Sequence, residues 1–174
     1  MSAVVEKWTV SVIVEKRPLK SVWQPFEWRP VAVLPAPVAA EPWTPLGGEE
    51  GGVSRWFAGL SDLVLFEKET QVYKHNVEAR EPAVYVVLRK DASARGLDLL
   101  LATIDPGEAH AHADSGDDIL EAVPMPPEIH AWMSAFVAKH HVERGFWKRK
   151  RDRADPEALA VGRNRISPAE DEDE

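Results

Sequence analysis

The chain contains no cysteine, and this absence removes several kinds of chemistry. It excludes disulfide bonds, thiolate zinc sites, iron–sulfur ligation and cysteine nucleophiles within these 174 residues. Cations are also outnumbered, because 21 Lys and Arg face 29 Asp and Glu and leave a formal net charge of -8. An acidic chain is a poor general binder of nucleic acid, whose phosphates must be met by positive charge.

Long apolar runs are missing as well. Nothing in the sequence approaches the roughly 20 apolar residues that a membrane-spanning helix needs. The apolar stretch at 10–14 is short and is followed at once by Glu15, which is not typical of a signal peptide. We therefore expect a cytoplasmic protein with no membrane partner. The composition, 44% hydrophobic and 29% charged, is typical of a folded globular domain.

The common catalytic motifs are absent too. Residues 47–52 are rich in glycine, but their two central glutamates would repel a phosphate group. There is no dinucleotide-binding glycine motif after a strand, no nucleophile elbow and no His-Glu-x-x-His. We therefore expect no catalytic residues and no cofactor, and we predict that the protein is not an enzyme.

Period-two alternation and runs of β-branched residues predict several strands. Pro30 should place the second of them at a sheet edge, because proline cannot donate to a ladder. The apolar run at 83–89 should be central, and the short gap to the next strand favours antiparallel pairing. The predicted strands are 8–15, 27–34, 60–66, 71–75, 83–89 and 97–104. Residues 35–54, with four prolines and four glycines, are predicted to be a long surface loop.

One long helix is predicted at 127–150. Pro127 suits the first helical position, and apolar residues recur at helical spacing from Ile129 to Val137. We therefore predict a single α+β domain over 1–155, with one mainly antiparallel sheet of five or six strands packed on this helix. Residues 156–174 should form a short turn and a disordered acidic tail.

Two groups of residues are candidates for binding a partner. A basic cluster with neighbouring aromatics could dock on an acidic protein, bind nucleic acid or simply be solvated; it comprises Arg144, Trp147, Lys148, Arg149, Lys150, Arg151 and Arg153, with Phe146. Exposed tryptophan beside arginine is enriched at interface hot spots, and Trp28 with Arg29 could be such a contact or could belong to the core. Trp23 is the third candidate of this group, and either interpretation stays open for it, as for Trp43 and Trp147. Buried tryptophan is more often core, and we expect that of Trp8 and Trp132.

Histidines provide two weaker candidates. On an extended segment, alternation would place Glu108, His110, His112 and Asp114 on one face as ligands for a metal ion, although a solvated loop is the simpler interpretation. His140 and His141 are adjacent on the predicted helix and do not face each other, so they should not chelate a metal as a pair. His140 is better explained as a histidine at the edge of the core that contacts a strand.

Several segments together resemble one bacterial family, known as domain of unknown function 3305. They are residues 12–18, 21–23, 28–33, 82–89, 123–126, 140–143 and 146–153. The basic run matches the family pattern, whereas the histidine pair at 110 and 112 does not. Members of this family are typically encoded beside genes for molybdenum-dependent formate dehydrogenase and its accessory proteins, and no catalytic residues are established for them.

The resemblance implies an accessory or assembly role for that enzyme, carried out by protein–protein binding. The expected partner is a formate dehydrogenase subunit or maturation factor. Two other functions stay open on the residues alone. One is a nucleic-acid-associated regulator that uses residues 144–153, and the other is a small metal-dependent enzyme that uses residues 108–114.

Overall fold

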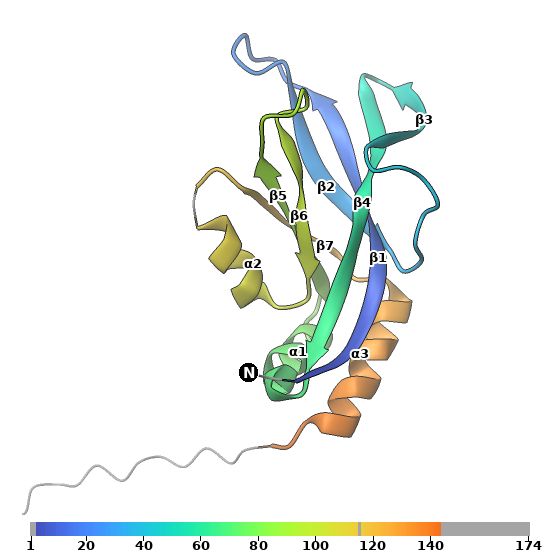
Figure 1. Ribbon diagram of the computed structural model, residues 1–174, viewed down its shortest axis with the longest axis vertical. Coiled ribbons are helices and arrows are strands. Elements are labelled where there is room, and N and C mark those ends of the chain that lie inside the picture. The colour runs from blue at the N-terminus through green and yellow to red at the C-terminus, as the bar shows by residue number, and fades with distance from the viewer. Residues whose placement is uncertain (1–2, 115, 144–174) are drawn as a thin grey trace, which may run out of the picture. The chain divides into compact units, whose positions relative to one another are not determined.

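The computed structural model describes residues 3–114 and 116–143. Seven strands form two antiparallel sheets, and three α-helices accompany them (Figure 1). In chain order the elements are β1 (Val4–Pro18), β2 (Phe26–Leu34), β3 (Thr44–Glu50), β4 (Val53–Phe66), the short 3-10 helix η1 (Glu67–Glu69), α1 (Thr70–Val77), β5 (Ala83–Lys90), β6 (Leu97–Thr103), α2 (Pro106–Ala113), β7 (Ile119–Pro124) and α3 (Pro127–His140). The α+β class is confirmed, whereas the prediction of one sheet on one long helix is wrong.

The two sheets face each other across a shared core. The four-stranded sheet has the order β2-β1-β4-β3, and the three-stranded sheet has the order β6-β5-β7. β2 approaches β7, and β4 approaches β6, so the sheets lie close along two edges. Fully buried valines of β1, Val10, Val12 and Val14, share one apolar cluster with Val84 and Val86 of β5. The alternation at 8–15 thus identified the buried face of β1.

β5 is the central strand of the smaller sheet, as its apolar run predicts. Val84 and Val86 point into the main core, whereas Val87, also fully buried, lies outside that cluster. α2 packs against β5 and buries Ala109, so the helix shields the outer face of the strand (Figure 1). The predicted antiparallel pairing of β5 with β6 is confirmed.

The chain between residues 35 and 54 is only partly the predicted loop. β3 occupies 44–50 and pairs with β4, which begins at Val53. Gly51 and Gly52, at φ 59° and 80°, form the two-residue turn between the paired residues Glu50 and Val53. Positive φ at both turn positions matches the twist of a hairpin, which is why two glycines there connect strands.

The first part of that predicted loop lies over the outer face of β1. The Ser11 hydroxyl, fully buried, donates to the carbonyl of Ala36 and accepts from the N–H of Val38, both at 2.8 Å. Ile13 and its cross-strand neighbour Phe57 are buried on the same face. Both faces of β1 are therefore covered near its centre.

Two further expectations are wrong. Residues 71–75 are helix α1 and not a strand, because Thr70, Tyr73 and Asn76 are buried at helical spacing of three. Strand β7 was not predicted either; Pro124 is its last residue, where a missing N–H is tolerated.

α3 begins at Pro127 as predicted but ends at His140, and residues 144–150 of the predicted helix lie outside the described residues. His141 adopts an extended conformation, with φ −75° and ψ 125°, and its Nδ1 lies 3.1 Å from the Thr70 hydroxyl. Ile129, Met133 and Phe136 bury one face of the helix in the core. In the described residues, α3 is also too short to cross a lipid bilayer, and so is every other helix.

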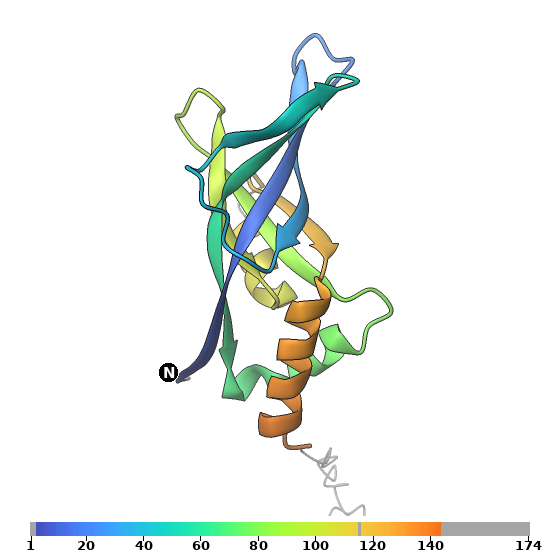
Figure 2. The same ribbon diagram turned by 90° about the vertical axis from the view of Figure 1, so that its right-hand side faces the viewer.

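One end of the described body is formed by helices and the other by the turns between strands. α1 and α3 lie at one end, whereas the β1–β2 turn and the β5–β6 turn lie together at the other (Figures 1 and 2). The second end carries the exposed side chains of Val22 and Trp23 and a cavity of about 530 Å³. It is the place to look for a binding site.

Candidate functional site

The β1–β2 turn presents two apolar side chains to solvent. Val22 and Trp23 are each 96% exposed. The turn is nevertheless closed, because the N–H of Leu19 donates to the Pro25 carbonyl at 2.9 Å and the Ser21 hydroxyl accepts from the N–H of Trp23 at 3.3 Å. An exposed indole on a closed turn is typical of an interaction hot spot.

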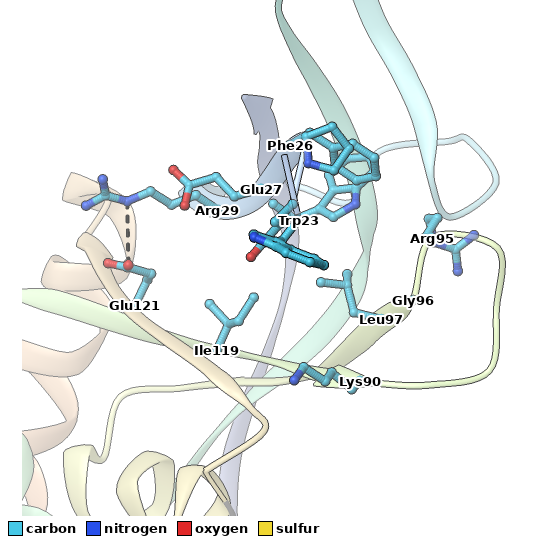
Figure 3. Close-up of a pocket in the computed structure, with 13 residues that line it drawn as sticks. Trp23, Phe26, Glu27, Arg29, Lys90, Arg95, Gly96, Leu97, Ile119 and Glu121 are labelled. Carbon is cyan, nitrogen blue, oxygen red and sulfur yellow. Dashed lines mark ion pairs between the residues drawn. The ribbon is translucent and has the colours of Figure 1, made fainter. Parts of the chain in front are cut away.

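Beside this turn lies a groove with a cavity of about 530 Å³ (Figure 3). Three segments form it: the turn with the start of β2, the β5–β6 hairpin, and the start of β7. Its lining residues are Trp23, Gln24, Pro25, Phe26, Glu27, Trp28, Arg29, Lys90, Arg95, Gly96, Leu97, Ile119 and Glu121. The volume falls within the range of ordinary ligand pockets.

The interior side of the groove is an aromatic cluster centred on Trp28, which is 7% exposed. Its ring meets those of Phe26, Trp43 and Trp56 edge to face, with centroids 6.3, 5.3 and 5.6 Å away. Edge-to-face pairs of this kind add stability beyond the burial of their area. The cluster therefore provides a firm apolar base for the groove.

Two cations lie against this cluster. Lys16 Nζ stands 4.2 Å from the ring centre of Phe26, and the Arg95 guanidinium stands 4.4 Å from that of Trp43. Both distances suit cation–π attraction, which holds the charge near the ring face. The aromatic surface thus places positive charge at the groove.

Two other cations of the groove are paired. Arg29 Nε lies 3.5 Å from a Glu121 carboxylate oxygen across the gap between β2 and β7 (Figure 3). Lys90 Nζ lies 3.2 Å from Asp117. Arg95 forms no ion pair within 4.0 Å in the part of the chain that the structure describes.

Two buried donors near the groove lack acceptors. Trp28 Nε1 and Arg95 Nε are both inaccessible to solvent and have no hydrogen-bond partner. Buried polar groups are usually satisfied, so two orphan donors on one lining point to a missing acceptor. Trp43 contacts both side chains, with its ring centre 5.3 Å from that of Trp28 and 4.4 Å from the Arg95 guanidinium.

A buried carboxylate lies on the neighbouring surface. Glu15 is 7% exposed and its carboxylate accepts from Arg17 at 2.7 Å and from Arg55 at 3.1 Å. The hydrogen bond from Arg17, followed by that from Arg55, lowers the pKa of Glu15 although burial acts in the opposite direction. Glu15 lines two smaller cavities of about 360 and 340 Å³, and its partners make it a structural carboxylate rather than a proton donor.

The structure brings together part of the predicted binding set. Trp23, Trp28 and Arg29 all line the groove, with Trp23 exposed and Trp28 in the core. The remaining members lie outside the described residues; they are Arg144, Trp147, Lys148, Arg149, Lys150, Arg151 and Arg153. Trp8 and Trp132 are half-buried against the core, with ring centres 5.5 Å apart.

The predicted metal-ligand geometry is wrong. Residues 106–113 are helix α2, so ligands two residues apart point to different sides and do not share one face. Glu108 instead accepts a hydrogen bond from Thr103, and His110 Nδ1 lies 2.6 Å from the Pro106 carbonyl. Among residues 3–114 and 116–143, no three or more His, Asp or Glu side chains lie close enough together to hold a metal ion. His112 and Asp114 are therefore not part of such a group.

His140 is at the edge of the core, as expected, and its ring and Nδ1 lie against Phe136 of α3 and Glu67 of η1. The two ring centroids are 4.5 Å apart, and Nδ1 lies 3.7 Å from the Glu67 carboxylate. Its Nε2 is buried without a partner. The side chain helps to join the end of α3 to the start of α1.

Sequence reasoning missed the residues that complete the groove, above all Arg95, Leu97, Ile119 and Glu121. Arg95 lies in the turn between β5 and β6, Leu97 is the first residue of β6, and the others belong to the unpredicted strand β7. In the sequence Arg95 lies between two small residues, Ala94 and Gly96. Nothing in that pattern indicates that its guanidinium lies against Trp43.

Comparison with known proteins identifies the family. The family model described as "Protein of unknown function (DUF3305)" matches residues 9–151. The chain belongs to this family. No curated protein and no solved structure matches the chain. The match to this DUF3305 model spans the groove residues and the basic run as far as Arg151, and Arg153 lies just beyond it.

Proposed function

We propose that this DUF3305 protein is a non-catalytic binding protein that docks a partner protein at the groove beside Trp23. The observation that carries the proposal is the fully exposed indole on a closed turn, next to a cavity with an aromatic base. A large apolar side chain held in water gains free energy when a partner covers it, which is why such residues dominate interface energetics.

The partner we propose is a subunit or maturation factor of a molybdenum-dependent formate dehydrogenase, in the cytoplasm. The family resemblance supports this choice through the genes that typically surround family members. The basic residues 148–151 form a second proposed contact. They supply charge for an acidic partner surface, whereas the groove supplies apolar area.

Binding rather than catalysis agrees with how the described polar side chains are used. Glu15 is held by two arginines, and the Thr103 hydroxyl is hydrogen-bonded to Glu108. Tyr73 has a pKa raised to about 12 by burial, and its hydroxyl accepts from the N–H of Phe66 at 3.1 Å. These groups are occupied in joining elements of the fold.

The test is affinity purification of the tagged protein from its own host grown on formate, with mass spectrometry of the co-eluting chains. The native chain is compared with a Val22→Ser/Trp23→Ser variant and with a variant in which Lys148, Arg149, Lys150 and Arg151 become serine. Leu60→Ser, which changes a 49% exposed apolar residue on β4, is the matched control.

We expect formate dehydrogenase or its maturation factors to co-elute with the native chain and the Leu60 variant, and to be lost with the turn variant. Equal capture by the turn variant would move the docking site away from the groove. Recovery of nucleic acid alone, removed by the basic-run variant, would favour a nucleic-acid-associated regulator instead.

A further inference from the structure

The inference concerns what the groove binds, and it rests on the proposed function. Two sheet edges border the groove. β2 is an edge strand of one sheet and β7 is an edge strand of the other. In the described residues no backbone hydrogen bond joins them, although Arg29 and Glu121 pair across the gap. An edge strand presents unpaired N–H and C=O groups that can accept another extended chain.

The groove also offers an apolar contact beside this edge. Phe26 lies at the start of β2, and Leu97 and Ile119 border the same cavity from β6 and β7 (Figure 3). Trp23 adds an exposed ring at the rim. A side chain that projects from a strand paired with β2 could bury itself between these groups, since side chains of an extended chain alternate between its two faces.

The polar requirement is more specific. In the described chain no carboxylate lies within 4.0 Å of the Arg95 guanidinium, although its charge acts at longer range on the carboxyl of Asp91, and the Arg95 Nε–H lacks an acceptor. Trp28 Nε1–H, whose ring also contacts Trp43, lacks one as well. Both are donors, and a carboxylate supplies two acceptor oxygens. Stacking on Trp43 holds Arg95 in place and so limits what can pair with it.

We propose that the groove binds an extended peptide segment of the partner, which adds a strand to the edge of β2, places an apolar side chain against Phe26 and Ile119, and pairs an aspartate or glutamate with Arg95. A second copy of this chain is a poorer occupant, because two molecules that each carry a net charge of -8 repel each other. The acidic side chain provides specificity, and the apolar side chain provides most of the buried area.

The test begins with a phage-displayed library of random heptapeptides, selected on the immobilised full-length protein. Selected peptides are made with a fluorescent label, and their affinities are measured by fluorescence anisotropy. Each is compared with a version in which Asp or Glu becomes Asn or Gln, and with versions N-methylated at single backbone nitrogens. The protein variants are Arg95→Gln and, as a matched control at an exposed arginine of the α1–β5 connection, Arg80→Gln.

We expect the selected peptides to share an acidic residue and a large apolar one. Arg95→Gln and the amide version of the peptide should each weaken binding at least tenfold, and combining them should add little, since both remove the same ion pair. N-methylation should weaken binding at alternate positions along the peptide, because every second N–H of an added strand points toward β2. Arg80→Gln should bind as the native protein does.

Other results overturn the inference. Selected peptides without acidic residues, equal binding by Arg95→Gln, or no selection at all would exclude the carboxylate. Light scattering that shows a dimer abolished by Trp23→Ser would make a second copy the occupant, and stronger peptide binding after removal of residues 156–174 would point to the chain's own tail. If Arg95→Gln does not fold, the amide peptide on native protein decides the question.

The two proposals can fail separately. Capture of a partner that depends on Trp23, with no dependence on a carboxylate, would uphold the docking site and reject the peptide chemistry. Carboxylate-dependent peptide binding without capture of formate dehydrogenase proteins would uphold the chemistry and reject the named partner.

Discussion

Asn76, near the end of α1, and Ala83, at the start of β5, exchange two hydrogen bonds. The Ala83 N–H donates to Asn76 Oδ1 at 3.0 Å, and Asn76 Nδ2 donates back to the Ala83 carbonyl at 2.9 Å. The same amide nitrogen also donates to the Ile104 carbonyl at 3.0 Å. One buried amide thus links helix α1 to the start of β5 and to the residue that follows β6.

Replacing Asn76 with alanine should lower the free energy of unfolding by about 2–3 kcal/mol, because three backbone groups would be left without partners. Urea denaturation followed by circular dichroism measures this loss. Gln71→Ala, at an exposed position on the same helix, is the control and should change stability by less than about 0.5 kcal/mol. Equal effects of the two variants would contradict the role given to Asn76.

Glu15 should make stability depend on acid pH. Its folded-state pKa is lowered, chiefly by the hydrogen bond from Arg17, so its stabilising contribution is complete above the ordinary value of 4.5 and is lost as the pH falls through the folded pKa. Glu15→Gln should therefore be less stable than the native protein at pH 7, by about 1–2 kcal/mol.

The difference between native and Glu15→Gln proteins should narrow below pH 4.5, the ordinary value for this carboxyl, and urea midpoints between pH 7 and pH 3 would show it. The control is Glu49→Gln, an exposed residue of β3. A constant difference across this range would mean that the Glu15 carboxylate is not stabilised by its arginines.

Gly59 should be intolerant of a side chain. It lies in β4 at φ 146°, opposite the irregular pairing at Val12 and Ile13, and an added Cβ would stand 3.4 Å from Leu99. The positive φ disfavours any L-residue, so Gly59→Ala should destabilise the protein by about 1–3 kcal/mol. Thermal melts of the two variants measure this loss. Gly48→Ala, where an added Cβ meets nothing within 4 Å, is the control and should be nearly neutral.

Trp23 should be dispensable for folding. Because its side chain is 96% exposed, Trp23→Ser should change the free energy of unfolding by less than about 0.5 kcal/mol. Its indole should also be reached by iodide in solution, so Trp23→Phe should reduce the quenchable fraction of tryptophan fluorescence. The buried Trp28 provides the contrast, since Trp28→Phe removes emission that iodide does not reach and should not lower that fraction.

The order of apolar and polar residues, together with the positions of proline, was enough to predict several elements. The buried face of β1, the edge position of β2 and the central position of β5 all follow from which residues are apolar and where proline falls. Pro127 likewise marks the start of α3. In each case the structural cause lies within the element itself.

Elsewhere the cause lies in another part of the chain. Val72 and Tyr73 resemble a strand, yet Tyr73 is buried because α1 packs against α3 and Phe136. Gly51 and Gly52 were read as loop because their partners across the hairpin are not obvious from the sequence. The groove is harder still, since Arg95 and Trp28 meet only through Trp43.

β1 has a consequence for how fast complexes form and break. The strand runs for 15 residues, pairs on both sides, and leads directly into the closed turn that carries Trp23. A partner that meets this turn has little of the protein to order, so the entropic penalty of association is small. Changes at Trp23 should therefore shorten the lifetime of the complex and leave its rate of formation almost unaltered.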